Sequence, residues 1–327
     1  MIAAPQRDRL SPFCDRTEVR ARTMIIPTIP SFRHILKGIW LPLLLMFVWD
    51  VLVTLLYFAQ PERYQEFQSS ALSRTTLTLF GTVIALFLGF RSNSAYARWW
   101  EGRVLWGLMI NASRNITRLA LSYIDSADAR ARELREAIVV NQAAYVHILR
   151  CQLRCTDRSE PAYRLLPADR AERMLAYTNA ANALLNENGR LAAQALAEGY
   201  IDTIQQSRME AVNIDVANAQ GGMERIKKTP LPMQFRLFPQ LFVRLFCILL
   251  PIGIAPYLGI FTPIGSSMVA LMFLAALHIG DELVDPFANS AHDLPLEAMC
   301  TTIEIDLMEL IERPAPSATQ PVKGVLW

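Results

Sequence analysis

Few residues in this chain have the types and spacing that catalysis or metal binding requires. Cys151 and Cys155 stand four positions apart on an expected helix, but no second pair and no nearby ligand cluster completes a metal site. His278 and Glu282 are too isolated a pair to carry chemistry. The sequence also lacks a GxGxxG turn, a Walker loop, an HExxH pair and a GxSxG motif. We therefore expect no enzyme, no catalytic residue, no metal and no cofactor.

Composition limits the class of protein. Of the residues, 52% are hydrophobic and 19% charged, and the mean hydropathy is +0.22. These values suit a few membrane helices plus a sizeable water-exposed part. The net charge of +2 gives no case for nucleic-acid binding. The five cysteines are scattered and odd in number, which favours reduced thiols, and we expect no cleaved signal peptide.

The stretch 74–106 organises the rest of the chain. Its first half is almost entirely apolar, and its second half is rich in arginine and tryptophan, with no proline between them. A single helix here places Thr82, Leu86 and Phe90 four residues apart on one stripe. In a bilayer, its arginines and tryptophans would lie near one interface. The alternative is a buried core helix whose polar end is solvated.

Three further apolar runs could cross a membrane. The run 40–58 is long enough for a hydrocarbon core of about 30 Å, and Asp50 within it should face protein or water. The runs 237–260 and 261–280 follow one another as a hairpin. Arg244 in the former could line a hydrated vestibule, pair with Asp50 or reach the interface.

The segment 101–236 is soluble in character. Apolar residues recur at helical spacing with charged faces over 133–155 and 167–196, and Gly189 and Gly199 are candidate break points. No alternating pattern indicates a strand. The stretch 199–226 predicts a further helix that ends near the Gly221–Gly222 pair. We therefore expect a helical domain with little or no sheet.

The predicted fold class is an all-α membrane protein with four transmembrane helices and a cytosolic helical domain. Arginine and lysine gather on the N-terminal flank and the middle segment, so the positive-inside rule places both termini in the cytoplasm, with the chain crossing the inner membrane several times. The predicted segments are an irregular N-terminal segment 1–30, the first two membrane helices 31–100, the cytosolic helical domain 101–236, the third and fourth membrane helices 237–284, a cytosolic C-terminal helix 285–312 and a disordered tail 313–327.

Three blocks of sequence resemble the bacterial branch of the bestrophin family. They are LGFRSNSAYARWWEGRVLWG at 88–107, ERIKKTPLP at 224–232 and DELVDPFANSAHDLPLEAMCTTIEIDLMEL at 281–310, and the resemblance covers about residues 25–312. It implies a homopentameric ion channel in which five copies of the second membrane helix line one axial pore. The other partners it implies are membrane lipid and permeant monovalent ions.

The resemblance also implies a hydrophobic neck in that pore. Aligned on the first block, the neck residues are Thr82, Leu86 and Phe90, the stripe that helical spacing also selects. Rings of Leu and Phe offer an ion no replacement for its hydration shell, and a narrow apolar constriction can exclude ions by dewetting. Threonine replaces the family's larger apolar residue, so we expect one wetter ring. The alternative for Leu86 and Phe90 is lipid-facing or core packing.

A second constriction and a calcium site are further features of the family. Distance from the second block assigns the cytosolic constriction to Ile204, with Ile201 as the alternative. Animal members bind calcium through an acidic run after the last membrane helix, and the matching segment 285–293 lacks that run. Calcium favours several carboxylate ligands. We therefore expect no calcium switch, and expect Asp293 to cap a helix that opens at Leu294.

The arginines and acids after the neck leave two readings open. Arg98, Glu101 and Arg103 could form an ion-pair network between subunits or coat a solvated helix. The flanking tryptophans favour the network.

The ion sign also stays open. Arg74 near the outer entrance would favour chloride-type anions, whereas Glu62 and Glu66 would favour monovalent cations. A non-conducting membrane scaffold or sensor remains the alternative function.

Overall fold

The computed structural model describes residues 32–62, 64, 74–124, 128–290 and 292–321. Every regular element in these ranges is helical, which confirms the predicted all-α class. The predicted segment 1–30 lies outside the described residues, as do residues 322–327 of the predicted tail. In chain order the elements are α1 (Phe32–Ala59), α3 (Arg74–Tyr123), α4 (Ala129–Arg154), α5 (Ser159–Leu165), α6 (Ala168–Leu175), α7 (Ala180–Ala197), α8 (Thr203–Lys228), α9 (Met233–Leu258), the 3₁₀ helix η2 (Gly259–Phe261), α10 (Thr262–Leu283) and α11 (Leu296–Leu310).

The chain divides into two compact units. Counting described residues only, the apolar unit consists of residues 32–102 and Arg225–Pro286, and the polar unit consists of Arg103–Glu224 and residues 287–321. The helices α3 and α8 each contribute residues to both units. The units are described separately below.

Among the described residues, three stretches are long and apolar enough to cross a membrane. They are Leu36–Ala59, Thr75–Tyr123 and Met233–Leu283. The last stretch contains both α9 and α10, which η2 separates. The chain is therefore a membrane protein with several apolar helices, in which the two predicted apolar runs at 237–280 form one continuous candidate span.

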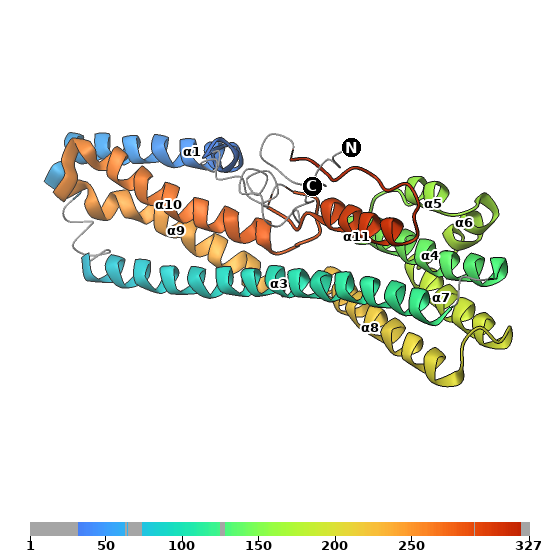
Figure 1. Ribbon diagram of the computed structural model, residues 1–327. Helices are drawn as coiled ribbons and strands as arrows, with labels where there is room; N and C mark the ends of the chain where they lie inside the picture. Colours follow the sequence, from blue (N-terminus) through green and yellow to red (C-terminus); the bar gives the residue numbers. More distant parts are fainter. Residues whose placement is uncertain (1–31, 63, 65–73, 125–127, 291, 322–327) are drawn as a thin grey trace, which may run out of the picture. The chain divides into compact units, whose positions relative to one another are not determined.

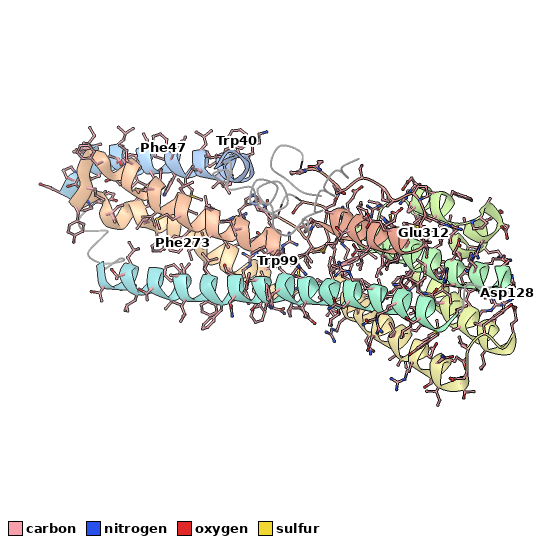
Figure 2. The ribbon with its side chains drawn as sticks, viewed as in Figure 1. Trp40, Phe47, Trp99, Asp128, Phe273 and Glu312 are labelled. Carbon is pink, nitrogen blue, oxygen red and sulfur yellow. The ribbon has the colours of Figure 1, made fainter. Side chains whose placement is uncertain are left out.

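In the apolar unit, α1, α9 and α10 lie side by side (Figure 1). Their shared core also includes residues of α3, and its buried members are Ile39, Leu77, Ile84, Leu88, Val243, Phe246, Cys247, Leu250, Ala270, Leu274 and Leu277. Gly253 allows α9 to approach α3, because a Cβ there would lie 2.7 Å from Cδ2 of Leu77. The outer face of α1 keeps large apolar side chains exposed, among them Trp40 and Phe47 (Figure 2).

Asp50 is fully buried on α1 and faces protein, as predicted. Its two carboxylate oxygens accept hydrogen bonds from the hydroxyl groups of Ser266 and Ser267 on α10, at 3.1 and 3.0 Å. Among the described residues, these two serines, and not Arg244, are the side-chain partners of the Asp50 carboxylate. Arg244 is exposed on α9. The buried carboxylate therefore joins α1 to α10 through neutral donors.

The polar unit is built around α4. All side chains from residue 138 to 149 are buried, so this part of α4 has no charged outer face, in contrast to the prediction for 133–155. A helix that is covered on every side has to pair its polar side chains inside the protein. The start of α4 is capped by Asp128, whose side chain accepts a hydrogen bond from the backbone N–H of Arg130 at 3.1 Å.

Two predicted helix boundaries are wrong. The helical stretch 167–196 is interrupted between α6 and α7 and not at the candidate break Gly189, which lies inside α7. The Asn179 side chain accepts a hydrogen bond from the N–H of Asn182 at 3.0 Å and starts α7. The predicted end near Gly221–Gly222 is also wrong, because α8 continues to Lys228. Gly222 serves packing instead, since a Cβ there would lie 2.8 Å from Cδ2 of Leu105.

Candidate functional site

The side of α3 opposite the core of the apolar unit carries the predicted stripe. Ile84 and Leu88 are buried against α9 and α10, and Leu86 lies about 160–200° around the helix from both. Leu86 is 58% exposed and Phe90 is 61% exposed. Thr82 is exposed as well, and it lies with Phe90 about 40° to either side of Leu86. Helical periodicity therefore brings Thr82, Leu86 and Phe90 onto one outward face.

Thr82 differs from the other two residues of the stripe because it is polar. Its hydroxyl donates a hydrogen bond to the carbonyl oxygen of Thr78, one turn earlier, at 2.9 Å. The proton of this hydroxyl is thus bound within its own helix, and the oxygen keeps only acceptor capacity for a group outside. The sequence does not reveal this difference between a donor and an acceptor.

Arg91, the residue after Phe90, is buried on the inner side of α3. Arg91 is 2% exposed and forms an ion pair with Asp281 on α10. Nε2 of Gln240 on α9 donates a hydrogen bond to the second carboxylate oxygen of Asp281 at 3.2 Å. Three helices of the apolar unit therefore meet at Asp281. The prediction placed Arg91 near a membrane interface, and its partners could not be identified without the fold.

Arg98 joins the ends of two helices. Its Nε donates to the carbonyl of Val284 at 3.0 Å, and its Nη1 and Nη2 donate to the carbonyls of Thr229 and Ile226 at 2.8 and 2.6 Å. Val284 is the C-cap of α10, and Ile226 and Thr229 lie at the end of α8. The last carbonyls of a helix lack intrahelical partners, and a cation there is favourable. Arg98 thus supplies hydrogen-bond donors to terminal carbonyls of both α8 and α10.

Two ion pairs support the same region of the apolar unit. Arg225 contacts Glu101 at 2.5 Å, and Lys227 contacts Asp285 at 2.6 Å. Arg98 and Glu101 therefore have partners within their own chain, Arg98 through hydrogen bonds to carbonyls and Glu101 through its ion pair with Arg225. Neither of the two interpretations drawn from the sequence included such contacts. Arg103 belongs to the polar unit.

Aromatic rings accompany this region of α3. Tyr96 stacks on Trp99 with ring centroids 6.2 Å apart and on Trp100 at 6.5 Å. Trp100 and Tyr96 stay about half exposed. Rings of this kind are typical of a membrane–water interface.

In the polar unit, the two candidates for the cytosolic constriction differ in exposure. Ile204 lies in the first turn of α8 and is 67% exposed. Ile201 is 5% exposed and packs in the core of the unit with Met209 and Ala195. Of these two candidates, Ile204 is the one with an exposed side chain.

Buried polar side chains connect α4 to α3 and α7. Nδ2 of Asn141 donates to the carbonyl of Leu184 at 2.7 Å and to Oδ1 of Asn188 at 2.8 Å. Asn188 in turn donates to Gln142 at 3.0 Å, and Gln142 donates to the Ser113 hydroxyl at 2.9 Å. The sequence analysis missed this network, although three amides on expected helices near apolar stripes were a signal that could have found it.

Glu304 on α11 is a second buried polar group of the unit. It is bound by Arg164 from α5, with Nη2 2.8 Å from Oε2, and Nε2 of His147 on α4 lies 2.8 Å from the same oxygen. Burial raises the pKa of Glu304, but the hydrogen bonds from Arg164 and His147 outweigh burial and lower the pKa to about 2. The carboxylate therefore stays ionised inside the protein.

In the segment that matches the animal calcium site, the one acidic side chain near its end is hydrogen-bonded within the segment. The Asp293 carboxylate accepts hydrogen bonds from the N–H and hydroxyl of Ser290 at 2.6 and 2.8 Å. The prediction that Asp293 caps a helix opening at Leu294 is wrong, because α11 begins at Leu296 and Pro295 occupies its N-cap. In the part of the chain that the structure describes, no cluster of three potential metal ligands occurs.

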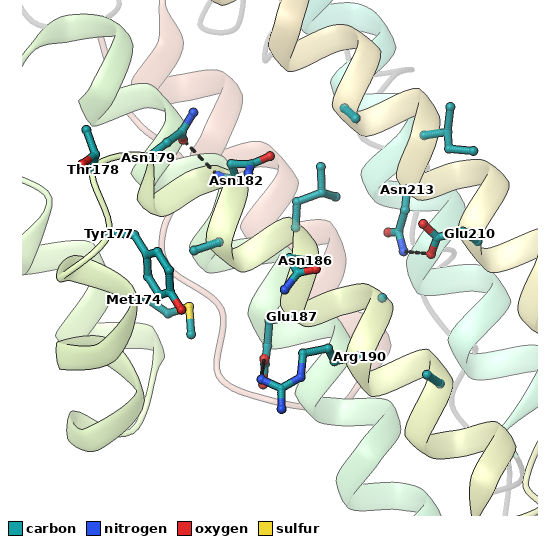
Figure 3. A pocket seen from close by; sticks show the side chains of 16 residues that line it. Met174, Tyr177, Thr178, Asn179, Asn182, Asn186, Glu187, Arg190, Glu210 and Asn213 are labelled. Atoms are coloured by element: carbon teal, nitrogen blue, oxygen red, sulfur yellow. Dashed lines mark hydrogen bonds and ion pairs between the residues drawn. The ribbon is translucent and has the colours of Figure 1, made fainter.

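A polar groove of about 810 Å³ lies in the polar unit between the 174–193 segment and α8 (Figure 3). Asn213 on α8 donates to Glu210 at 3.1 Å, and Arg190 contacts Glu187 at 3.4 Å. Amide and carboxylate side chains make up much of the lining of the groove. None of the predicted site residues lines it.

The sequence of the chain is similar to the sequences of several known proteins. Residues 19–309 match the family described as Bacterial/Fungal Bestrophin protein. The voltage-dependent anion channel-forming protein mll4386 of Mesorhizobium japonicum is 32% identical over 303 residues, which cover 91% of this chain and 96% of that protein. The voltage-dependent anion channel-forming protein YneE of Escherichia coli (strain K12) is 34% identical over 71% of this chain and 75% of its own length.

A solved structure gives the same result for the fold. The crystal structure of a bacterial bestrophin homologue from Klebsiella pneumoniae superimposes with a TM-score of 0.75 at 32% sequence identity, and the match covers 83% of this chain and 99% of that one. The similar proteins are named as channel-forming proteins and not as enzymes, which confirms the expectation drawn from the missing motifs.

Proposed function

Because the chain belongs to the bacterial and fungal bestrophin family, we propose that five copies form a channel that conducts small monovalent ions passively through one axial pore. The observation that supports this most is the outward face of α3. Thr82, Leu86 and Phe90 project from the side opposite the core, where a soluble protein would expose polar residues. Packing among the described residues of the chain does not use this face of α3, so it is free to line an axial pore.

In the proposed pore, the stripe forms a hydrophobic neck. Five Leu86 and five Phe90 side chains surround the axis and leave a passage in which an ion loses part of its hydration shell without replacement. Thr82 adds a ring of hydroxyl oxygens whose protons are bound to Thr78, so this ring hydrates the passage through acceptors. Small changes in ring diameter then switch conduction.

We further assign the cytosolic constriction to Ile204. Its exposure supports this assignment, and the burial of Ile201 speaks against the alternative. A second ring of apolar side chains at this position would act on ions through the same dewetting.

The proposed topology has four crossings, made by α1, α3, α9 and α10. The 26 residues of α9 and the 22 residues of α10 are each longer than the roughly 20 residues that a crossing needs, so Met233–Leu283 can pass the membrane twice. Both termini then lie in the cytoplasm of an inner-membrane protein, and residues 103–224 of the polar unit form a cytosolic domain.

We propose anions of the chloride type as the permeant ions, because the relatives are named for anion channels. Of the residues considered for the outer entrance, Glu62 is exposed, Glu66 lies outside the described residues and the side chain of Arg74 is not described. A reversal potential measured across a bilayer under a potassium chloride gradient tests the ion sign. A reversal potential near that of potassium would replace anions by monovalent cations.

The channel itself is tested by ion flux into proteoliposomes that contain the purified protein. Leu86→Ala and Phe90→Ala should raise the conductance or the open probability, since they widen the neck. Leu45→Ala on the exposed face of α1 is the matched control and should leave flux unchanged. A complete absence of flux in the parent protein and in both neck variants would favour the non-conducting scaffold.

A further inference from the structure

The two flanks of the α3 stripe differ in side-chain size. Val83 and Phe87 lie about 60–100° from Leu86 in one sense around the helix, and both are exposed. Ala85 and Gly89 lie about 60–100° from Leu86 in the other sense, and both are exposed as well. One flank of the helix is therefore bulky, and the opposite flank is nearly without side chains.

The small flank is hollow. A Cβ on Gly89 would meet nothing within 4 Å. Ala85 borders two apolar grooves of the apolar unit, one of about 580 Å³ toward α9 and one of about 540 Å³ toward α10. Gly81 contributes to the former groove and Gly89 to the latter. Together the grooves form a concave surface along α3.

The bulky flank is held in place from within the chain. The ring of Phe87 meets Phe242 of α9 edge to face, with centroids 6.5 Å apart and an interplanar angle of 61°. Phe87 still keeps 51% of its surface exposed. The Phe87 ring is thus held in one orientation by Phe242, and its exposed part projects from α3 before any other chain contacts it.

We propose that Val83 and Phe87 of each copy pack into the Ala85–Gly89 flank of α3 in the next copy. This inference rests on the proposed pore, in which α3 helices stand around one axis. Rotation about that axis brings one flank of each helix against the opposite flank of its neighbour, so a closed ring needs two different, complementary faces. A surface that packed only against itself would give a dimer.

The heights along the helix agree with this packing. Copies related by the axis present equal positions at equal height, so Phe87 lies level with the gap between Ala85 and Gly89, about 3 Å from each along the helix. Val83 lies in the same way between Gly81 and Ala85. Small residues let membrane helices approach closely, and close packing is the main force that joins them in lipid.

The test is the mass of the purified complex, measured by native mass spectrometry or by light scattering in detergent. Ala85→Phe fills the hollow and should reduce the mass from that of the pentamer to about one-fifth. Leu45→Phe places the same ring on the exposed face of α1 and should leave the pentamer intact.

The double variant Ala85→Phe/Phe87→Ala moves the large ring to the small flank of α3 and the small side chain to the bulky flank. The two flanks are then complementary again, so this variant should restore the pentamer and its ion flux. Positions 85 and 87 lie on opposite flanks of one helix, so this rescue can act only between copies and not through folding of a single chain. A pentameric Ala85→Phe variant, or a double variant that stays monomeric, would overturn the interface while leaving the channel proposal in place. A monomeric parent protein would overturn both.

Discussion

Arg91 on α3 is paired with Asp281 on α10 one position after the exposed ring of Phe90. Nε and Nη1 of Arg91 are buried and have no hydrogen-bond partner among the described residues, so Asp281 alone compensates the charge. Because Asp281 also accepts a hydrogen bond from Gln240, the pair joins α3, α9 and α10. It thereby holds the helix that carries the proposed neck.

Removing the carboxylate should destabilise the apolar unit. Asp281→Ala leaves the Arg91 cation buried and unpaired, and we expect a loss of about 3 kcal/mol in the free energy of unfolding. The value is at the low end for a buried pair because the Asp281 side chain is 32% exposed. Thermal unfolding in detergent measures it.

Two variants show whether the ion pair causes that effect. Arg91→Met/Asp281→Leu should recover most of the stability, since well-packed apolar residues often replace a buried pair without loss. Asp285→Ala, which breaks the more exposed pair with Lys227, should cost less than about 1 kcal/mol. Equal losses for Asp281→Ala and Asp285→Ala would contradict this account.

Arg98 should not tolerate lysine. The planar guanidinium donates to three carbonyls at two helix ends. The ammonium group of lysine is compact and carries its donors on a single nitrogen, so it cannot bond all three carbonyls at once. Arg98→Lys should therefore lower stability by about 2 kcal/mol, the net contribution of one or two charge-assisted hydrogen bonds. Arg225→Lys, at an exposed pair with Glu101, is the control and should change stability by less than about 0.5 kcal/mol.

The polar unit should lose stability at low pH through Glu304. Its pKa is lowered from 4.5 to about 2 in the folded chain, so the folded state favours the ionised form. The resulting stabilisation is fully present above pH 4.5 and is lost as the pH falls from 4.5 to 2. It amounts to about 3 kcal/mol.

Glu304→Gln gives the control for this titration. The amide cannot ionise, so the variant should be less stable than the parent protein at pH 7, and the two stabilities should converge toward pH 2. Urea unfolding followed by the helical circular-dichroism signal measures both. Parallel pH profiles would show that another carboxylate is responsible.

Thr82 should set the wetness of the neck. Thr82→Val replaces the hydroxyl by a methyl group of similar size, and we expect the conductance to fall severalfold because the passage becomes easier to dewet. Thr82→Ser keeps the hydroxyl and should conduct at least as well as the parent protein. Single-channel recording in planar bilayers distinguishes the two variants, and an unchanged conductance in Thr82→Val would place this residue outside the conduction path.

Local pattern predicted much of the fold. The apolar runs predicted α1, α9 and α10, and the absence of proline between residues 74 and 106 predicted one continuous helix there, as α3 is. Spacing alone also placed Thr82, Leu86 and Phe90 on one face of α3. These features depend on neighbours within two or three turns, which is the range over which periodicity acts.

Partners distant in the chain could not be predicted in this way. Arg91 and Asp281 are separated by 190 positions, and Arg98 reaches carbonyls 128 to 186 positions away. The charges were visible in the sequence, but an arginine near a membrane interface has many possible partners. Gly222 was misread as a helix end for the same reason, since only its contact with Leu105 shows that it permits close packing.

By itself, the sequence determined that the chain is helical, membrane-spanning and equipped with an apolar stripe on its longest helix, because composition and the helical period are local properties. Tertiary structure decided which charges are buried and what compensates them, since a buried charge is tolerated only where the fold brings a specific partner to it. It also decided that the stripe faces away from the core, because only packing of Ile84 and Leu88 against α9 and α10 defines an inner and an outer side of α3.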